Sequence, residues 1–101
     1  HPFMNQDIHA QLFAAEIGDV PELDIHGLSV HMAIKELEDF IGRESGRKTS
    51  AIRVICGHGT GALFTGITHF LQKPHPLIAA WRPATAYTNS TGAIIVIALY
   101  S

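Results

Sequence analysis

The sequence predicts an α/β fold, because of the order in which its apolar patterns follow one another. A short alternating segment at 23–26, an amphipathic stretch from Ser29 and an apolar run at 52–56 are typical of strand, helix and strand. More than twenty residues separate the two strands, so we expect them to pair in parallel through a right-handed crossover. A second helical stretch and two further apolar runs then predict a mixed four-stranded sheet with two main helices.

Length and composition indicate one compact domain. The chain has 101 residues, 47% apolar and 16% charged, which suits a single modest core. We expect residues 1–20 to form an N-terminal extension with a short helix and residues 21–101 to form the domain itself. The net charge of −2 and pI of 6.4 exclude the strongly basic character of a nonspecific nucleic-acid binder, so a polyanion would be bound only locally.

The single cysteine, Cys56, excludes an internal disulfide and is compatible with a reducing compartment, so we expect a cytoplasmic protein. We predict that Cys56 is a small core residue and not a nucleophile. The longest apolar run, 93–100, is far shorter than the roughly 20 residues that a membrane-spanning helix needs. The first residues show no secretory-signal pattern.

In the N-terminal extension, the residue pattern predicts a helix that is capped by Asn5 or Asp7 and ends before Gly18. At 23–26, alternation turns two apolar side chains inward and leaves Asp24 and His26 together on the outer face. From Ser29, the apolar positions fall on one side of a helix: Val30, Ala33, Ile34, Leu37, Phe40 and Ile41. We expect residues 42–50 to form the loop that returns to the strand at 52–56.

Three glycines follow that strand, and a second helix is expected to open at Thr60 and to stop at the Pro74 and Pro76 break. Its apolar face comprises Leu63, Phe64, Ile67, Phe70 and Leu71. Residues 79–82 and 93–100 predict an antiparallel hairpin. Because the last strand is apolar on both faces, we expect the N-terminal helix, with Phe3, Ile8 and Phe13, to cover the face opposite the main helices.

The parallel pairing predicts a site at one edge of the sheet. The carboxyl ends of both strands meet there, which brings Asp24 and His26 beside the glycine loop at 57–61. Residues without a Cβ let backbone N–H groups approach an anion closely, and the first turn of the following helix adds partial positive charge. We therefore predict a phosphate-binding loop formed by Gly57, His58, Gly59, Thr60 and Gly61.

Two motifs carry a resemblance to a known family: Leu-Asp-Ile-His-Gly-Leu at 23–28 and Gly-His-Gly-Thr-Gly at 57–61. The chain resembles the Smr (small MutS-related) domain from about Glu22 to Leu99, including His-Pro-Leu at 75–77 and Trp-Arg-Pro-Ala at 81–84. This resemblance implies a βαβαββ two-layer sandwich similar to the C-terminal domain of bacterial translation initiation factor three. It also implies an endonuclease that nicks DNA or cleaves RNA, including messenger RNA on stalled ribosomes, so that nucleic acid and the ribosome are the expected partners.

The chain departs from the family pattern at two positions. Many members have histidine immediately before the glycine loop and lysine between its first two glycines, where this chain has Cys56 and His58. A free histidine titrates at about 6.5, so loss of the lysine weakens phosphate attraction near neutral pH. A noncatalytic nucleic-acid or ribosome-binding module is therefore an alternative function, and a protein-interaction domain with an inert pocket is a third.

Two chemistries fit Asp24 and His26. In the first, the carboxylate orients the imidazole, His26 deprotonates a 2′-hydroxyl of RNA, and loop amides with His58 or Arg82 stabilise the developing charge. In the second, Asp24 holds Mg²⁺ or Mn²⁺ and the ion activates water, as a DNA nick would require. The residues do not choose between these routes.

Each of these residues also has a purely structural reading. Asp24 and His26 would then satisfy backbone groups of the next turn, and the glycines would form only a tight turn. Trp81 is compatible with two roles, packing in the core and stacking on a base. The seven histidines show no closed zinc-ligand set, and we expect His31, His69 and His75 to be solvated.

Overall fold

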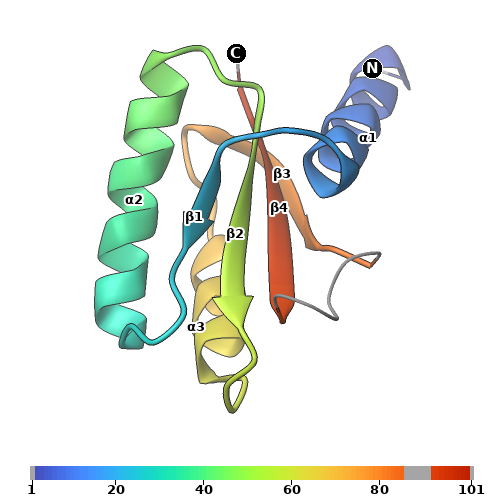
Figure 1. Ribbon diagram of the computed structural model, residues 1–101. Helices are drawn as coiled ribbons and strands as arrows, with labels where there is room; N and C mark the ends of the chain where they lie inside the picture. The colour runs from blue at the N-terminus through green and yellow to red at the C-terminus, as the bar shows by residue number, and fades with distance from the viewer. Residues whose placement is uncertain (1, 86–91, 101) are drawn as a thin grey trace.

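The computed structural model describes residues 2–85 and 92–100, with side chains from residue 8 onward. The elements in chain order are α1 (Pro2–Ile17), β1 (Glu22–Asp24), α2 (Val30–Gly46), β2 (Ala51–Gly57), α3 (Ala62–Leu71), β3 (Ile78–Pro83) and β4 (Ala93–Leu99). Figure 1 shows four strands in one sheet, with α2 and α3 beside each other and α1 apart from them. Within the described part of the chain, no helix is both long and apolar enough to cross a membrane.

The strands form one mixed sheet in the order β1-β2-β4-β3. β1 pairs with β2 in parallel, with Asp24 opposite Ile55, whereas β4 pairs antiparallel with both β2 and β3. These pairings confirm the predicted parallel crossover, the antiparallel pairing of the last two strands and the α/β class. The predicted connection between those two strands falls largely on residues 86–91, which lie outside the described residues.

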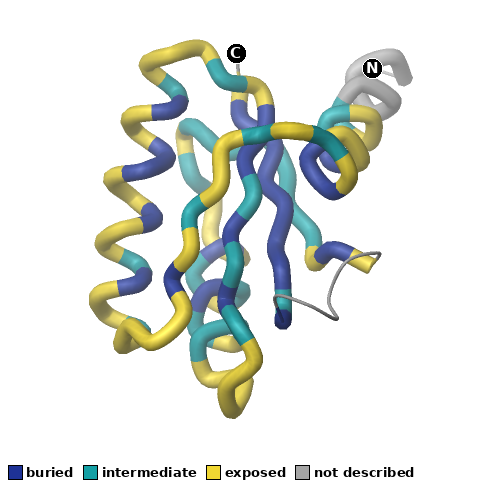
Figure 2. The backbone as a smooth tube through the Cα atoms, viewed as in Figure 1, coloured by how far each residue is buried: buried dark blue, intermediate teal, exposed yellow. Residues whose placement is uncertain are grey.

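The sheet is covered on both faces, so every residue of the central strands β2 and β4 is buried or partly buried (Figure 2). The larger core lies beneath α2 and α3 and includes Leu37, Ile41 and Ile67. The smaller one lies beneath α1, where Leu12 and Ala15 pack with Val96 and Ala98 of β4. The covering role predicted for the N-terminal helix is confirmed, and the helix ends before Gly18 as expected.

Two of the predictions made for that helix, its cap and the burial of Phe13, are wrong. The helix begins at Pro2, so Asn5 and Asp7 lie inside it and do not cap it. Ile8 packs against the smaller core, but Phe13 is 56% exposed because Leu12 and Ala15 occupy the buried side of the helix. The side chain of Phe3 lies outside the described residues.

Helix α2 begins as the sequence predicts and ends later. The Ser29 hydroxyl accepts a hydrogen bond from the Met32 N–H at 3.2 Å and caps the helix. The loop predicted at 42–50 is wrong in its first half, because α2 continues to Gly46. The cause is Glu44, whose buried carboxylate accepts a hydrogen bond from the Thr49 hydroxyl at 2.8 Å and so ties the chain after the helix back onto its last turn.

Helix α3 begins at Ala62, two residues after the predicted start, because Gly61 adopts a left-handed conformation with φ of 92°. The two main helices approach closely: a Cβ at Gly66 would lie 2.5 Å from Cγ1 of Val30. Both helices therefore start at the same edge of the sheet, as Figure 1 shows.

His75, which precedes β3, is a correction to the predicted solvated histidines. Its ring is 16% exposed, and its Nε2 lies 2.7 Å from Oε1 of Glu38 on α2. Nδ1 accepts a hydrogen bond from the Leu77 N–H at 3.1 Å, so Nε2 carries the ring proton and donates a hydrogen bond to Glu38. His75 therefore joins the segment before β3 to α2. His31 and His69 are exposed as predicted.

Candidate functional site

The candidate site lies where β1 and β2 end. β1 stops at Asp24, and the Ile25 N–H donates to the Ile55 carbonyl at 2.9 Å, which keeps the next residues beside β2. The Ile25 side chain is fully buried in the larger core. This anchor leaves the exposed His26 at the sheet edge next to Gly57, the last residue of β2.

Asp24 and His26 form a hydrogen-bonded pair. Oδ1 of Asp24 lies 2.7 Å from Nδ1 of His26 and accepts a second hydrogen bond from the His26 backbone N–H at 3.0 Å. The hydrogen bond from the ring, followed by the backbone hydrogen bond, lowers the pKa of Asp24 below its ordinary value of 3.8. Because an ionised carboxylate can only accept, Nδ1 donates to Asp24, and in the neutral ring this leaves Nε2 with a lone pair for a substrate.

The glycine loop touches this pair at Gly57. A Cβ built there would lie 2.8 Å from the Cβ of His26, and Gly57 has a φ of 85°. Both facts require glycine: a side chain would collide with His26, and other residues rarely adopt this conformation. The backbone of Gly57 also contacts Gly92, just before β4, where an added Cβ would lie 2.2 Å from the Gly57 carbonyl carbon.

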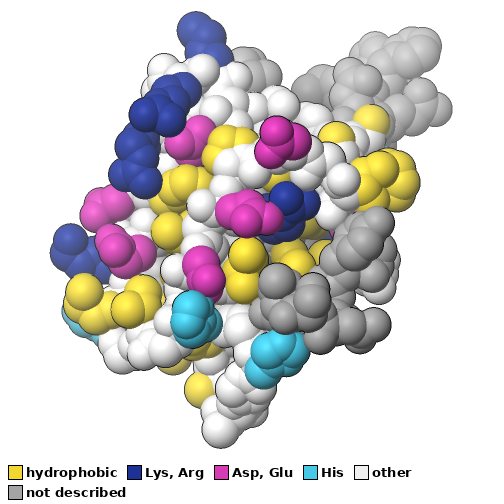
Figure 3. Space-filling model, in the orientation of Figure 1, with side chains coloured by type: hydrophobic (Ala, Val, Ile, Leu, Met, Phe, Trp, Pro, Cys, Tyr) yellow, Lys and Arg dark blue, Asp and Glu magenta, His cyan; other side chains and the backbone are white. Residues whose placement is uncertain are grey.

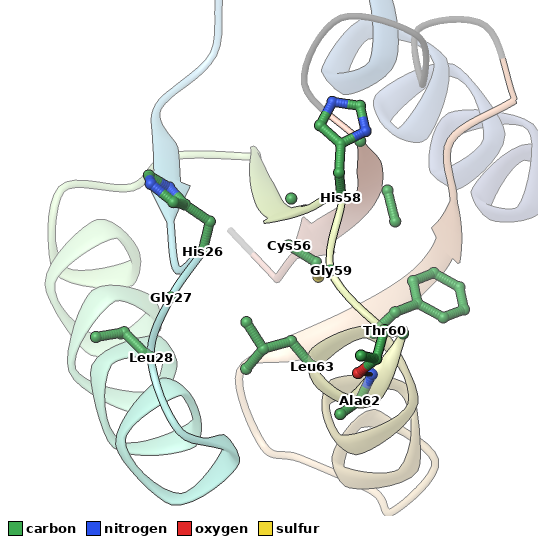
Figure 4. A pocket seen from close by; sticks show the side chains of 14 residues that line it. His26, Gly27, Leu28, Cys56, His58, Gly59, Thr60, Ala62 and Leu63 are labelled. Atoms are coloured by element: carbon green, nitrogen blue, oxygen red, sulfur yellow. Dashed lines mark hydrogen bonds between the residues drawn. The ribbon is translucent and has the colours of Figure 1, made fainter.

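The loop and His26 border one cleft of about 740 Å³. Its lining residues are His26, Gly27, Leu28, Cys56, Gly57, His58, Gly59, Thr60, Gly61, Ala62, Leu63, Phe64, Gly92 and Ala93. Figure 4 shows His26 on one side of the cleft and His58 on the other, with Cys56, Gly59 and Leu63 between them. In Figure 3 histidine side chains, in cyan, lie near the lower end of the molecule, where β1 and β2 end.

The first turn of α3 forms one wall of this cleft. Ala62, Leu63 and Phe64 line it, and the Thr60 hydroxyl accepts a hydrogen bond from the Ala62 N–H at 3.4 Å. Backbone N–H groups at a helix start carry partial positive charge and favour an anion. All five residues predicted for the phosphate-binding loop, 57–61, border the same space as His26.

Cys56 lines the floor of the cleft but lacks the character of a nucleophile. Its side chain is buried, and burial raises its pKa to about 11. The thiol therefore stays protonated near neutral pH, whereas a thiolate is the reactive form.

The structure places Arg82 away from the cleft. It lies on β3, the edge strand farthest from β1, and its guanidinium donates a hydrogen bond to the buried carboxylate of Glu16 on α1. The Thr85 hydroxyl donates to the same carboxylate at 3.2 Å, and the pKa of Glu16 is lowered, chiefly by the Arg82 hydrogen bond. Arg82 therefore joins α1 to the sheet, and its proposed phosphate contact has no support in the geometry. Trp81 packs against the larger core and is a structural residue.

The site offers few ligands for Mg²⁺ or Mn²⁺. Among the side chains of residues 8–85 and 92–100, no three His, Cys, Asp or Glu come together as a metal-binding group. Asp24 is the carboxylate of the site, and its Oδ1 already accepts two hydrogen bonds from His26. Magnesium prefers an octahedral shell of oxygen ligands, so this donor set fits it poorly.

Sequence reasoning missed the apolar part of the cleft. Leu63 and Phe64 were expected in the core, yet they are only partly buried and line the cleft. Leu28 and Ala93 also border it. The helical pattern could not separate core from cleft positions, because both lie on the apolar side of α3. The glycine at 92, just before an apolar run, was a usable signal of close backbone approach.

Comparison with known proteins supports this picture. The family model for the Smr domain matches residues 23–98. The chain is 33% identical over 76 residues to the Endonuclease MutS2 of Thermomicrobium roseum, and 32% identical over 74 residues to that of Leuconostoc mesenteroides. These matches cover 75% and 73% of this chain but only 10% and 9% of the relatives, so the chain spans about a tenth of their length.

A solved structure agrees with the sequence matches. The crystal structure of the Smr domain of Thermus thermophilus MutS2 superposes with a TM-score of 0.71 and 28% sequence identity. The match covers 81% of this chain and all of that one. The fold, the two motifs at the sheet edge and the family match together show that this chain belongs to the Smr domain family.

Proposed function

We propose that this domain is an endonuclease that cleaves phosphodiester bonds of RNA by acid-base chemistry at Asp24 and His26. The observation that carries the proposal is the close approach of His26 to Gly57: the Cβ of a histidine whose ring is held by Asp24 lies beside the start of the glycine loop, and His26 and the loop line one cleft. A phosphate on the loop would then lie within reach of a base. The Endonuclease MutS2 relatives support the same class of reaction.

The reaction follows from the tautomer of His26. Nε2 accepts the proton of the 2′-hydroxyl, and the 2′-oxygen attacks the adjacent phosphorus. The bond to the 5′-oxygen breaks, that oxygen takes up a proton from water, the imidazolium of His26 returns its proton to the solvent, and a 2′,3′-cyclic phosphate and a 5′-hydroxyl remain. Asp24 stabilises the imidazolium, while amides of residues 57–61 and the start of α3 stabilise the negative charge on the phosphate.

This route favours RNA over DNA. It uses the 2′-hydroxyl as nucleophile, and it needs only groups that the cleft supplies. DNA lacks that hydroxyl. Nicking of DNA would therefore need water activated by a metal ion, and Asp24 alone provides a poor site for such an ion.

The test is incubation with end-labelled single- and double-stranded RNA and DNA, each with and without EDTA, followed by end-group analysis of any product. We expect RNA cleavage in EDTA with cyclic phosphate ends. His26→Ala is expected to lower the rate by about 10²- to 10⁴-fold, and Asp24→Asn by about 10²-fold or more. His69→Ala, a change at an exposed histidine of α3 outside the cleft, is the matched control.

Several results would contradict the proposal. Cleavage that requires a divalent ion and leaves 5′-phosphates would replace the acid-base route with the metal route. Full activity of His26→Ala would remove His26 from the mechanism, and absence of product from every substrate would reject nuclease activity.

A second candidate is a noncatalytic nucleic-acid or ribosome-binding module. One observation favours it: the described residues that line the cleft include no lysine or arginine, and His58 stands where many family members have lysine. Binding that survives Asp24→Ala and His26→Ala, together with no cleavage by the parent, would select this function. Absence of any nucleic-acid binding would point to a protein-interaction domain instead.

A further inference from the structure

The cleft is larger and more apolar than a phosphate site needs. Small-molecule pockets of about 300–1,000 Å³ hold whole organic ligands, and this cleft measures about 740 Å³. The glycine loop and His26 account for one part of its lining. The other part is apolar and consists of Leu28, Ala62, Leu63, Phe64 and Ala93.

The apolar part is continuous with the phosphate part. Figure 4 shows Leu63 reaching from α3 toward the loop that carries Gly27 and Leu28, directly below Cys56 and Gly59. Phe64 follows Leu63 in the same turn of α3, and both side chains remain only partly buried. Leu28 is 37% exposed, so apolar surface is left open on the side of the β1–α2 loop as well.

The close approach of α2 and α3 sets this geometry. The contact between Gly66 and Val30 holds α2 and α3 together, so that Leu28, before α2, and Leu63, at the start of α3, line the same cleft. Leu63 and Phe64 are thus carried by a helix that packs against α2.

We propose that the apolar wall formed by Leu63 and Phe64 in the first turn of α3 receives one unstacked nucleobase of the strand whose phosphate lies on the glycine loop. A nucleobase has two apolar faces and a polar rim, and an aromatic side chain stacks on it with little regard to sequence. Bases inside a duplex are already stacked and paired, so only a single-stranded or flipped-out base reaches the wall. This inference rests on the proposed function, from which it takes the position of the phosphate. It predicts that the substrate is a single-stranded nucleic acid.

Binding is measured by fluorescence anisotropy in EDTA with three labelled probes of equal length. The first is a single-stranded 2′-deoxy oligonucleotide, which lacks the hydroxyl needed for the proposed cleavage. The second is the same strand with every base removed, and the third is the duplex. We expect the parent to bind the intact strand about tenfold or more tightly than the baseless strand, since stacking of one base is worth roughly that factor.

The protein variants are Phe64→Ala and Leu63→Ala, with Phe13→Ala as the control. Phe13 is 56% exposed on α1 and does not line the cleft. We expect Phe64→Ala to weaken binding of the intact strand by about 5- to 150-fold and to leave the baseless strand unchanged. Circular dichroism establishes that each variant is folded, and the baseless probe tests the idea without any change to the protein.

The outcomes separate this inference from the nuclease proposal. Equal affinity for intact and baseless strands, or equal weakening of both by Phe64→Ala, overturns the base subsite and leaves the cleavage assay to decide the reaction. Base-dependent binding by a protein that cleaves nothing supports the subsite and rejects the nuclease. Preferred binding of the duplex, or no binding of any strand, overturns the subsite.

Discussion

Gly57 shows how one missing Cβ sets the distance between the two parts of the site. The loop approaches His26 so closely that a methyl group would lie 2.8 Å from the His26 Cβ. Gly27 has nearly the same backbone conformation, with φ of 81° against 85°, yet a Cβ there would meet nothing within 4 Å. A comparison of substitutions at these two glycines therefore separates the cost of backbone strain from the cost of steric contact with His26.

We expect Gly57→Ala to cost more stability and more activity than Gly27→Ala. The left-handed conformation alone costs an alanine about 1–2 kcal/mol at either position. The contact with His26 adds overpacking of about 1–3 kcal/mol at Gly57 and displaces the imidazole from the loop. Urea unfolding and the RNA-cleavage rate measure the two effects, and equal losses in the two variants would contradict this account.

Cys56 gives a second prediction for a single residue. Because burial raises its pKa to about 11, we expect iodoacetamide to react with the folded protein at pH 7.5 much more slowly than with the same protein in urea. The rate in the folded state should keep rising as the pH approaches 11. Mass spectrometry follows the alkylation. Rapid labelling of the folded protein at pH 7.5 would show that the thiol is ionised and reopen a nucleophilic role.

At the scale of elements, the contact between α2 and α3 decides the shape of the cleft. Gly66 permits this contact, because the Val30 methyl groups occupy the space where a side chain would be. Gly42 lies in the exposed part of α2, and a Cβ there would meet nothing within 4 Å. Both glycines are inside helices, so they differ only in their surroundings.

We expect Gly42→Ala and Gly66→Ala to change stability in opposite directions. Alanine favours a helix over glycine by about 1 kcal/mol, so Gly42→Ala should stabilise the protein by up to that amount. At Gly66 the same gain is offset by a clash with the stiff, branched Val30, so the net effect should be a loss of about 1–2 kcal/mol. Urea unfolding gives both values. Adding Val30→Ala should restore part of the loss at Gly66, and failure to do so would assign the effect to another contact.

At the scale of the whole molecule, α1 is joined to the sheet by a buried charge. Glu16 of α1 is 4% exposed and accepts hydrogen bonds from Arg82 of β3 and from Thr85. Residues 1–20 were predicted as an extension, and the family model starts at residue 23, yet the α1 side chains Leu12 and Ala15 belong to the smaller core. Helix α1 is therefore packed as part of the domain.

Glu16 gives this packing a pH dependence. Its pKa is lowered in the folded state, so the unfolded chain takes up the proton at a higher pH than the folded protein does. The stabilisation is therefore present above the ordinary value of 4.5 and is lost as the pH falls through the lower folded value. We expect Glu16→Gln to lose about 1–3 kcal/mol at pH 7, and the difference from the parent to shrink below pH 4.5.

Chemical unfolding at pH 7 and pH 3 measures this difference. Asp39→Asn is the control, since Asp39 pairs with Lys35 through two exposed side chains and should contribute at most about 1 kcal/mol. A loss for Glu16→Gln that is the same at both pH values would show that the ionised carboxylate is not the cause.

Much of the fold and part of the site could be read from the sequence, because the signals are local. Periodicity located both main helices and the strands, and the length of the crossover required the parallel pairing that brings Asp24 and His26 to the glycine loop. The predicted positions of the 57–61 loop and of the Asp24–His26 pair at one edge are confirmed by the geometry. Their chemical roles stay a prediction.

Other features depended on contacts between distant residues, and no local pattern reports such contacts. Arg82 and Trp81 adjoin in the sequence, yet strand alternation sends one to the α1 face and the other to the larger core. Glu44 prolongs α2 through the hydrogen bond from Thr49, and the partly buried His75 is hydrogen-bonded to Glu38 of α2. The cleft that Leu63 and Phe64 line also includes residues of the β1–α2 loop, β2 and β4, which only the tertiary structure brings together. The sequence by itself determined which chemical groups reach the sheet edge, whereas tertiary packing decided how close they lie and what space remains between them.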